Sequence, residues 1–267
     1  MIDGHERDDK LRQMDSLHGT DVNRSASCIL REDGEFTLYR VQPTGSTGSV
    51  LVVRPADEHP PTALLERLAH EFALKDVLNS QWAARPLKLV RDDARMVLVL
   101  EDPLGELLER QIGGPGEVGH VLSLAVGIAA ALGKVHQHGL VHKDIKPAHI
   151  LVDCVDGHVR LTGFGSASRR TYERQSPEPP ETIVGTLAYM APEQTGRMNR
   201  SIDSRSDLYA FGVTLYQMLT GTLPFTAADP MEWVHCHVAR NPDQQIRGSC
   251  SPESQSAMRR PPNFVSI

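Results

Sequence analysis

The sequence has little of what marks several protein classes. Its four cysteines are far apart and form no C-x-x-C pair, so neither a disulfide framework nor a zinc site is expected, and the thiols are taken as reduced. Lysine and arginine (28) are outnumbered by aspartate and glutamate (34), for a formal net charge of −6. A nucleic-acid surface needs a basic face, which this balance does not favour. We therefore expect no nucleic-acid partner.

Export and membrane signals are also absent from the sequence. The first residues, "MIDGHERDDKLRQMDS", are charged and contain no apolar core of a secretory signal. No apolar run approaches the roughly 18 residues that a membrane span requires. We expect a cytoplasmic protein without a membrane span.

A change of pattern divides the apolar part of the chain. Short β-rich runs, such as "CILREDGEFTLYRV" and "GSVLVVRP", stand on both sides of a helical segment that prolines open, "PPTALLERLAHEFALKDVL". This order predicts a small α+β unit up to about residue 102. Beyond it, apolar residues recur at helical spacing in "GHVLSLAVGIAAALGKVHQHG" and "SDLYAFGVTLYQMLTG".

These patterns predict four regions. Residues 1–24 are polar and aperiodic, and we expect a flexible leader there. The α+β unit occupies residues 25–102 and the helical unit residues 103–240. Residues 241–267 are rich in Ser, Pro and Gln without a sustained period, which predicts a disordered tail.

Four motifs stand in an order that is typical of one family: "LVHKDIKPAHILV", "GFG", "GTLAYMAPE" and "SDLYAFGVTLYQMLTGTLPF". Four motifs in order are a strong signal, whereas one would be weak. They resemble the eukaryotic-type Ser/Thr protein kinase domain. The longer run from "GTLAYMAPEQTG" to "DPMEWVHCHVAR" is similar to the N-terminal kinase-like domain of large bacterial multidomain sensor proteins, which continue into an ATPase module and a histidine-kinase end.

The resemblance implies an α+β, bilobal kinase-like fold. A small β-rich lobe with one helix (25–102) precedes a larger, mainly helical lobe (103–240), and the C-terminal end of the larger lobe has no counterpart in this chain. ATP is the implied cofactor, and protein substrates or downstream ATPase and histidine-kinase modules are the implied partners. Glu193 normally pairs with an arginine of the missing part, so we expect it to lack that partner.

By the same resemblance, three residues form the catalytic part. Asp144 matches the carboxylate that orients the substrate hydroxyl, and Lys146 matches the lysine that neutralises the transferred phosphate. Thr186 resembles the residue that bonds both of them. Asp207 resembles a helix residue that braces the backbone amides of the catalytic loop.

The metal-holding residues of the family are replaced. A kinase holds Mg²⁺ with the Asp of D-F-G and the Asn at the end of the catalytic loop. This chain has Gly163 and His149 at these positions. Glycine supplies no ligand, and imidazole suits Zn²⁺ or Mn²⁺ better than Mg²⁺. We expect no metal held by side chains, and whether Mg or Mn is used stays open. The grouped histidines are more consistent with hydrogen bonding than with a metal cluster.

The strand lysine of the family is also replaced. In "VLVVRP", Arg54 is the residue that we align with it, and an arginine fork is not equivalent to a compact ammonium group. Its expected helix partner is Glu71, with Glu66 as the second choice. A surface pair of Glu71 with Lys75 one turn on is the alternative.

The expected nucleotide-binding residues come from both lobes. Of the glycine-rich hairpin only Gly34 and the tip Phe36 remain, which limits close approach of backbone N–H groups to phosphate. The resemblance puts the hinge at Leu100–Leu104 and an apolar side chain beneath the base. The full set of expected cofactor-binding residues is Gly34, Phe36, Arg54, Glu71, Leu100, Glu101, Asp102, His149, Leu151 and Gly163.

Three interpretations follow for function. The first is ATP-dependent phosphoryl transfer to protein Ser/Thr with a degraded Mg²⁺ site. The second is a catalytically weak or inactive pseudokinase that acts as a nucleotide-binding or protein-interaction module. The third is a non-functional fragment. Because metal ions contribute several kcal/mol to such barriers, losing both metal-holding side chains costs roughly a thousandfold or more in rate.

Overall fold

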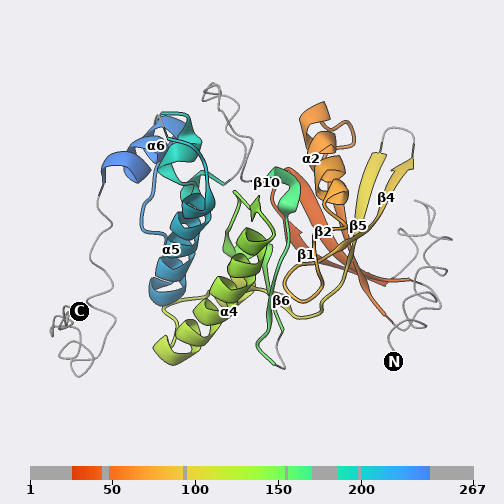
Figure 1. The fold of residues 1–267 in the computed structure, drawn as a ribbon, viewed down its shortest axis with the longest axis horizontal. Coiled ribbons are helices and arrows are strands. Elements are labelled where there is room, and N and C mark those ends of the chain that lie inside the picture. Colours follow the sequence, from red (N-terminus) through yellow and green to blue (C-terminus); the bar gives the residue numbers. More distant parts are fainter. Residues whose placement is uncertain are drawn as a thin grey trace.

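The computed structural model describes residues 26–43, 48–92, 95–153, 156–169, 186–197 and 200–240. They form two lobes, a β-sheet lobe with one helix and a mainly helical lobe, which lie side by side (Figure 1). The predicted α+β bilobal fold is confirmed. The predicted leader (1–24) and tail (241–267), together with Cys154 and Cys250, lie outside the described residues.

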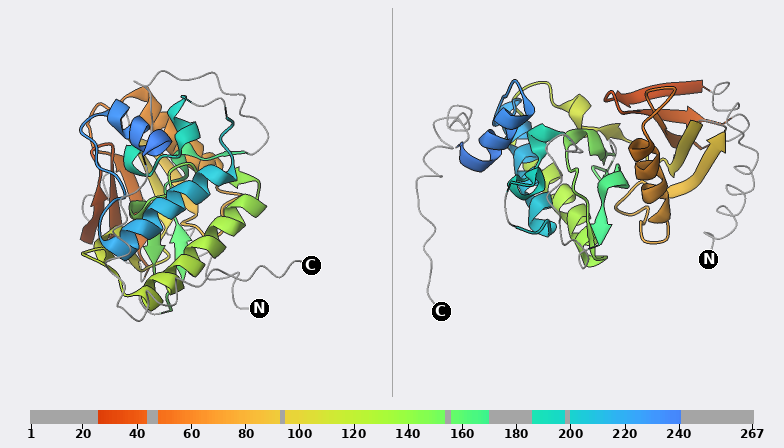
Figure 2. Two further views of the ribbon diagram at one scale, coloured as in Figure 1. Left: turned by 90° about the vertical axis from the view of Figure 1, so that its left-hand side faces the viewer. Right: turned by 90° about the horizontal axis from the view of Figure 1, so that it is seen from above.

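The first lobe is built on an antiparallel sheet with the strand order β1-β2-β3-β5-β4. Helix α2 (Thr62–Ala73) packs across β4 and β5 on one face of this sheet (Figures 1 and 2). The strands are β1 (Ala26–Glu32), β2 (Phe36–Gln42), β3 (Val50–Pro55), β4 (Pro86–Asp92) and β5 (Arg95–Glu101).

The two faces of β3 belong to different apolar clusters. Successive side chains of a strand point to opposite faces. Leu51 and Val53 join the cluster that includes Leu151 of the second lobe, whereas Val50 and Val52 join a smaller cluster on the other face. The face that carries Leu51 and Val53 is therefore the one that meets the second lobe.

The second lobe is mainly helical, with two small sheets of order β6-β8-β9 and β10-β7. Its elements are β6 (Glu106–Leu107), α3 (Leu108–Gln111), α4 (Val118–Gln137), β7 (Leu140–Val141), η1 (Pro147–His149), β8 (Ile150–Val152), β9 (Val159–Leu161), η2 (Phe164–Ser166), β10 (Ser168–Arg169), η4 (Leu187–Tyr189), η5 (Pro192–Thr195), α5 (Ser204–Thr220) and α6 (Pro230–Ala239).

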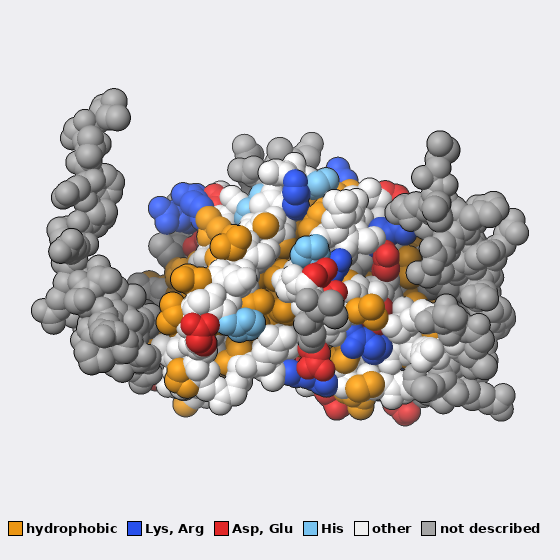
Figure 3. All heavy atoms as spheres, turned by 90° about the horizontal axis from the view of Figure 1, so that it is seen from below, with side chains coloured by type: hydrophobic (Ala, Val, Ile, Leu, Met, Phe, Trp, Pro, Cys, Tyr) orange, Lys and Arg blue, Asp and Glu red, His pale blue; other side chains and the backbone are white. Residues whose placement is uncertain are grey.

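Helix α4 lies beside α5 along one side of this lobe (Figure 2). Its buried side carries Ile128 and Leu132, which pack in the core. Its other side exposes Leu122 and Val126, and hydrophobic side chains gather on the helical half of the face in Figure 3. By length and composition α4 could cross a membrane, a property that core helices of folded proteins share. The sequence argument did not single out this segment, although its length and composition meet the requirement.

Capping residues fix where α5 and α6 begin and end. The side chain of Asp229 accepts hydrogen bonds from the first backbone amides of α6, and Pro230 takes the first helical position, as the sequence predicts. Asp203 caps α5 in the same way, and Gly221 ends it with a φ of 75°. The N-terminal turn of α5 is thereby placed under the loop that carries the site.

Candidate functional site

The catalytic loop, as we call residues 140–152, runs from β7 to β8. Asp207 of α5 is fully buried, and its carboxylate accepts hydrogen bonds from the backbone N–H groups of His142 at 2.9 Å and Lys143 at 2.8 Å. Lys143 has a φ of 69°, a left-handed conformation that costs a non-glycine residue about 1–3 kcal/mol unless its surroundings hold it. The bracing role predicted for Asp207 is confirmed.

Asp144 lies in the loop with its backbone held by two buried histidines. Nδ1 of His142 accepts from the N–H of Asp144 at 3.3 Å, and its Nε2–H donates to the carbonyl of Thr162 at 3.0 Å. Nδ1–H of His149 donates to the carbonyl of Asp144 at 2.7 Å. Burial lowers the pKa of His142, and it lowers the pKa of His149 well below its ordinary value. Two neutral rings therefore hold the backbone of Asp144.

The three predicted catalytic residues come together in the structure. Nζ of Lys146 lies 3.2 Å from Oδ2 of Asp144 and donates to Oγ1 of Thr186 at 2.7 Å. Asp144 and Lys146 are both buried. This array can hold a hydroxyl group near a carboxylate and an ammonium group, which is the substrate side of a phosphoryl-transfer site.

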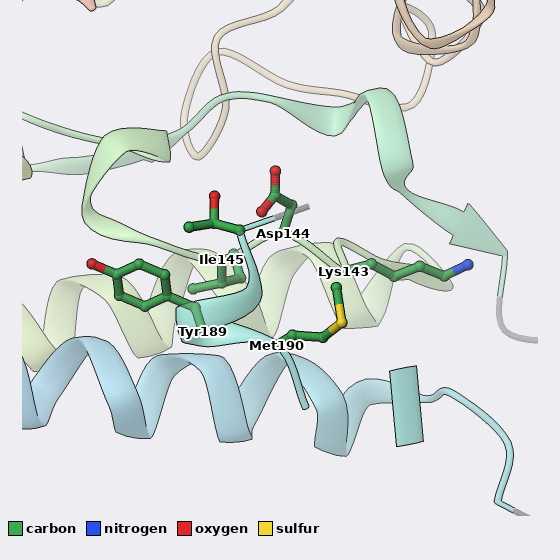
Figure 4. A pocket seen from close by; sticks show the side chains of 6 residues that line it. Lys143, Asp144, Ile145, Tyr189 and Met190 are labelled. Atoms are coloured by element: carbon green, nitrogen blue, oxygen red, sulfur yellow. The ribbon is translucent and has the colours of Figure 1, made fainter. Parts of the chain in front are cut away.

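A hollow beside the loop gives access to this array. Lys143, Asp144, Tyr189 and Met190 line it, and the side chains of Lys143 and Asp144 point in different directions from adjacent positions (Figure 4). The hydroxyl group of Tyr189 donates to Gln217 at 2.6 Å, and burial raises the pKa of this tyrosine to about 12. The wall of the hollow is thus fixed by a neutral hydrogen bond.

His149 fills the space next to Gly163. A Cβ atom built on Gly163 would lie 2.7 Å from Nε2 of His149 and 2.8 Å from two of its ring carbons. Gly163 also has a φ of 79°, which favours glycine. The imidazole therefore takes up the volume into which a side chain at position 163 would project.

The site does not fit Mg²⁺. This ion needs oxygen ligands in near-octahedral geometry. One of the two expected oxygen donors is a glycine, and the other is a neutral imidazole whose Nδ1 is already bound to Asp144. Within the described residues no group of three His, Cys, Asp or Glu side chains could hold a metal ion.

Glu71 of α2 faces the site, as predicted, and does not form the alternative surface pair. It is 4% exposed, while Lys75 lies over the ring of Phe72. Burial raises the pKa of Glu71 to about 6, and the backbone N–H groups of Phe164 and Gly163 offset part of this rise. Its Oε1 has no hydrogen-bond partner. Among the described residues no cation forms an ion pair with Glu71, although the charges of Arg31 and Arg67 also lower its pKa.

Arg54 is not that cation, so this prediction is wrong. Its side chain is exposed and lies over the ring of Tyr39, 4.8 Å from the ring centroid, on the face of the sheet that points away from α2. The alternation of β3 brings Val53 to the cleft face instead. Neighbouring residues of a strand point to opposite faces, so an alignment that is wrong by one residue selects the wrong face. Our alignment of "VVRP" placed Arg54 at the lysine position, which Val53 occupies.

The β1–β2 hairpin does not form a phosphate cradle. Gly34 lies at its exposed turn with a φ of 83°, between the exposed acidic residues Asp33 and Glu35. Phe36 is not an exposed tip, because it is buried in the first lobe beneath Arg67. Carboxylates at the turn repel phosphate, so the binding roles predicted for Gly34 and Phe36 are not supported.

The predicted hinge residues are held by the protein itself. The buried carboxylate of Asp102 accepts two hydrogen bonds from Arg40, at 2.6 and 3.1 Å, and one from Ser49 at 2.6 Å. Glu101 accepts from Ser80 at 2.6 Å. Leu100 and Leu151, the expected neighbours of a base, are 0% and 1% exposed and belong to one apolar cluster.

Sequence reasoning missed Arg31, which reaches from β1 into the site. Nη1 of Arg31 donates to the carbonyl of Ala148 in the catalytic loop at 3.0 Å, and its side chain is 8% exposed. Its positive charge also acts to lower the pKa values of Glu71 and His149. The sequence argument gave this residue no role, but a basic residue inside the hairpin sequence "REDGEF" was a signal that could have been weighed.

Glu193 has a neutral hydrogen-bond partner that the sequence argument did not consider. Its Oε1 accepts a hydrogen bond from the hydroxyl group of the fully buried Ser206 at 2.6 Å. The sequence argument considered only an arginine from a missing segment, whereas the N-terminal turn of α5 supplies a neutral donor. This hydroxyl group satisfies one oxygen of the buried carboxylate without adding a charge.

Most of the grouped histidines are hydrogen-bonded, as predicted. His136 pairs with Asp207 at 2.8 Å, and Nδ1–H of His138 donates to the carbonyl of Lys134 at 2.7 Å. His237 accepts from the hydroxyl group of Tyr209 at 2.8 Å. These rings fasten helices and loops of the second lobe.

Comparisons with known proteins identify the family to which this fold and these motifs point. The sequence model described as "Protein kinase domain" matches residues 46–262. Serine/threonine-protein kinase PksC of Streptomyces coelicolor is 36% identical over 142 residues, which cover 52% of this chain and 25% of that protein. AfsK of Streptomyces griseus is 42% identical over 130 residues (49% and 16%), and pkn2 of Myxococcus xanthus is 29% identical over 229 residues (79% and 27%). The chain thus covers about a quarter or less of the length of these relatives.

Proposed function

Because this chain belongs to the protein kinase domain family, we propose that it is a pseudokinase, a kinase-fold signalling domain without metal-dependent phosphoryl transfer. In this proposal the domain acts by binding partner proteins through its surface and not by phosphorylating them. The proposed domain comprises two lobes, residues 25–102 and 103–240. We place it in the cytoplasm of a bacterial cell.

One observation carries the proposal: the ring of His149 occupies the space beside Gly163. The two metal-holding side chains of the family are not merely absent, because the Nε2 edge of the His149 imidazole occupies the volume of a side chain at position 163. A third change supports the same conclusion, since Val53 stands where the cleft face of β3 would present a cation to Glu71. Restoring one residue alone would therefore not restore the site.

The expected size of the rate loss supports the pseudokinase proposal. Metal ions stabilise transition-state charge by several kcal/mol, and each ~1.4 kcal/mol is tenfold in rate. Losing the metal and the strand cation together lowers the rate by roughly 10³-fold or more. A loss of this size favours a role through binding over a role through phosphate transfer.

A second candidate function is residual ATP-dependent transfer to protein Ser or Thr. The contact of Lys146 with both Asp144 and Thr186 favours it, because the substrate side of the site is intact. On this candidate, ATP with Mg²⁺ or Mn²⁺ would be held by backbone groups and by the nucleotide itself. We rank it second because no side chain at positions 149 and 163 provides an oxygen ligand.

Thermal denaturation with ATP, in the presence and absence of Mg²⁺ or Mn²⁺, separates the two candidates. A ligand that binds the folded state raises the melting temperature with its concentration. The pseudokinase proposal predicts that adding either metal ion leaves the effect of ATP unchanged. A rise in melting temperature that requires the metal ion would favour the enzyme.

The wider context of this domain is also a proposal. The relatives are several times longer than the matched part, and the run "GTLAYMAPEQTG" resembles domains that precede an ATPase module and a histidine-kinase end. We propose such downstream signalling modules, or a protein bound by the second lobe, as partners. Pull-down with isolated downstream modules, if the gene encodes them, tests this directly.

A further inference from the structure

We infer that the nucleotide cleft of this chain is filled by its own side chains and held shut by arginines, so that it takes no adenine nucleotide. The inference deepens the proposed function, on which it rests, because it chooses between a nucleotide-binding and a nucleotide-free pseudokinase. Four observations lead to it, from the base end of the cleft to the phosphate end.

Leu51 fills the base end of the cleft. It lies on the cleft face of β3, opposite Leu100 of β5, in one apolar cluster with Leu38 of the neighbouring strand β2 and Leu151 of the second lobe. Leu51 and Leu100 are 0% exposed, and Leu38 and Leu151 are 1% exposed. A gap wide enough for one water molecule would expose these side chains, so the two lobes are in direct contact here.

The size of a base makes this contact decisive. Two carbon atoms in contact have their centres about 3.5–4.0 Å apart. A flat base between two leucine side chains therefore needs the carbon atoms of those side chains to be roughly 7–8 Å apart. The contact of Leu51 with the cluster that contains Leu151 leaves no such separation. Binding a base would require the lobes to move apart and both leucines to lose their packing.

Arg40 fastens the outer edge of the cleft. It lies opposite Leu51 in the β2–β3 register and therefore points to the cleft face. Besides its two bonds to Asp102, its Nη2 donates to the carbonyl of Gly105 at 2.8 Å. Because the carboxylate of Asp102 is fully buried, this is a charge-assisted clasp between β2 and the segment that leads into the second lobe.

Arg31 fastens the phosphate end. It lies opposite Leu38 in the β1–β2 register, and its bond to the carbonyl of Ala148 joins the hairpin to the catalytic loop. A third arginine, Arg110 of α3, donates to the carbonyl of Ile29 at 2.6 Å. The hairpin is therefore bonded to the second lobe at several points along its length and cannot lift over a ligand without breaking them.

The charge around the phosphate end also disfavours a polyphosphate. The hairpin turn carries Glu32, Asp33 and Glu35, all exposed. Asp33 accepts the backbone N–H groups of Glu35 and Phe36, at 3.1 and 2.8 Å, so these amides are not available to a phosphate. The one buried cation that faces the cleft from this hairpin, Arg31, already bonds to the loop.

Leu51 and the arginines together give the domain one fixed arrangement of its lobes. Leu51 excludes the base, whereas Arg31 and Arg40 act as positioning residues that hold the hairpin on the second lobe. The surface offered to a partner protein is then independent of nucleotide concentration. This property suits a scaffold and does not suit a nucleotide sensor.

The test is a titration with metal-free nucleotide. Wild-type chain and the variant Leu51→Ala with Arg31→Ala are titrated with adenosine and with a fluorescent ADP analogue, each without divalent ions. We expect no saturable binding by the wild type up to millimolar concentration, and a gain of at least tenfold in apparent affinity in the double variant. Arg54→Ala is the matched control, because it removes an exposed arginine from the other face of β3 and should behave as the wild type.

Two results would overturn the inference. One is saturable binding of either probe by the wild type. The other is a folded double variant that still binds neither probe, because filling would then not be the cause. If the double variant does not fold, hydrogen exchange decides: amides of the β1–β2 hairpin should exchange at least tenfold faster in Arg31→Ala than in the wild type, and unchanged exchange contradicts the clasp.

This test and that of the proposed function fail separately. A wild-type chain that binds nucleotide without transferring phosphate refutes the filled cleft and leaves the pseudokinase intact. A chain that binds nucleotide and also transfers phosphate in a metal-dependent reaction refutes both.

Discussion

His149 and Gly163 form a complementary pair in which the ring of one occupies the side-chain space of the other. A Cβ on Gly163 would come within 2.7 Å of Nε2 of His149, and the ring is itself fixed by its bond to the carbonyl of Asp144. The histidine at position 149 and the glycine at position 163, both departures from the family pattern, therefore depend on each other sterically. This relationship explains why the site remains well packed after losing its metal-holding side chains.

The first prediction compares two glycines of nearly equal conformation. Gly163→Ala should destabilise the protein by about 3 kcal/mol, because it adds a contact with a fixed ring to the cost of a left-handed φ. Gly34→Ala, with a φ of 83° and nothing within 4 Å, should cost only about 1–2 kcal/mol. Urea unfolding measures both, and equal costs would show that His149 does not fill the space.

The second prediction concerns Glu71 and pH. Its pKa in the folded protein is about 6, above the ordinary value of 4.5, so the folded state binds this proton more tightly. The contribution of Glu71 to stability therefore falls as pH rises from about 4.5 to 6 and remains lower above that, by about 2 kcal/mol. Burial lowers the pKa values of His142 and His149, so their contribution to stability decreases as pH falls below about 6.5, which is the opposite dependence.

Glu71→Gln isolates the Glu71 contribution from that of the histidines. The free energy of unfolding of this variant, minus that of the wild type, should increase by about 2 kcal/mol between pH 4.5 and pH 7. Glu66→Gln, on the exposed side of the same helix, is the control and should follow the wild type. Parallel profiles for Glu71→Gln and the wild type would contradict the buried, unpaired carboxylate.

The third prediction concerns the brace of the catalytic loop. Asp207→Ala leaves two backbone N–H groups of the loop without an acceptor and should destabilise the protein by about 3 kcal/mol. His136→Gln removes only a partly exposed partner of the same carboxylate and should cost less. Hydrogen exchange of the amides of His142 and Lys143 provides the local readout, and protection retained in Asp207→Ala would refute the brace.

The fourth prediction concerns Glu193. Ser206→Ala removes the hydroxyl group that donates to this buried carboxylate and should cost about 1–3 kcal/mol. Ser201→Ala, at an exposed position just before α5, should be neutral. If the two variants are equally stable, Glu193 has another source of stabilisation.

The sequence predicted those parts of the site that lie in one continuous motif. Asp144, Lys146 and His149 occur within six residues, and Gly163 follows at a fixed spacing, so their convergence needed only the order of motifs. The bilobal fold followed from the same order together with the change from strand to helix periods. Asp207 was predicted because its helix carries a recognisable pattern.

The rest depended on contacts between distant segments. Whether Val53 or Arg54 faces the cleft is decided by the pairing of β3 with β2 and β5, which a single strand does not reveal. The bond of Arg31 to Ala148 joins residues 117 positions apart. The bond of Ser206 to Glu193 required knowing that the first turn of α5 packs against η5.

Phosphate transfer from γ-labelled ATP to the chain itself and to a generic protein substrate, with Mg²⁺ or Mn²⁺, tests the central claim most directly. We predict that incorporation by the wild type is indistinguishable from that of Asp144→Asn, in which the carboxylate of the loop is removed. Metal-dependent incorporation that the wild type shows and Asp144→Asn loses would contradict the account.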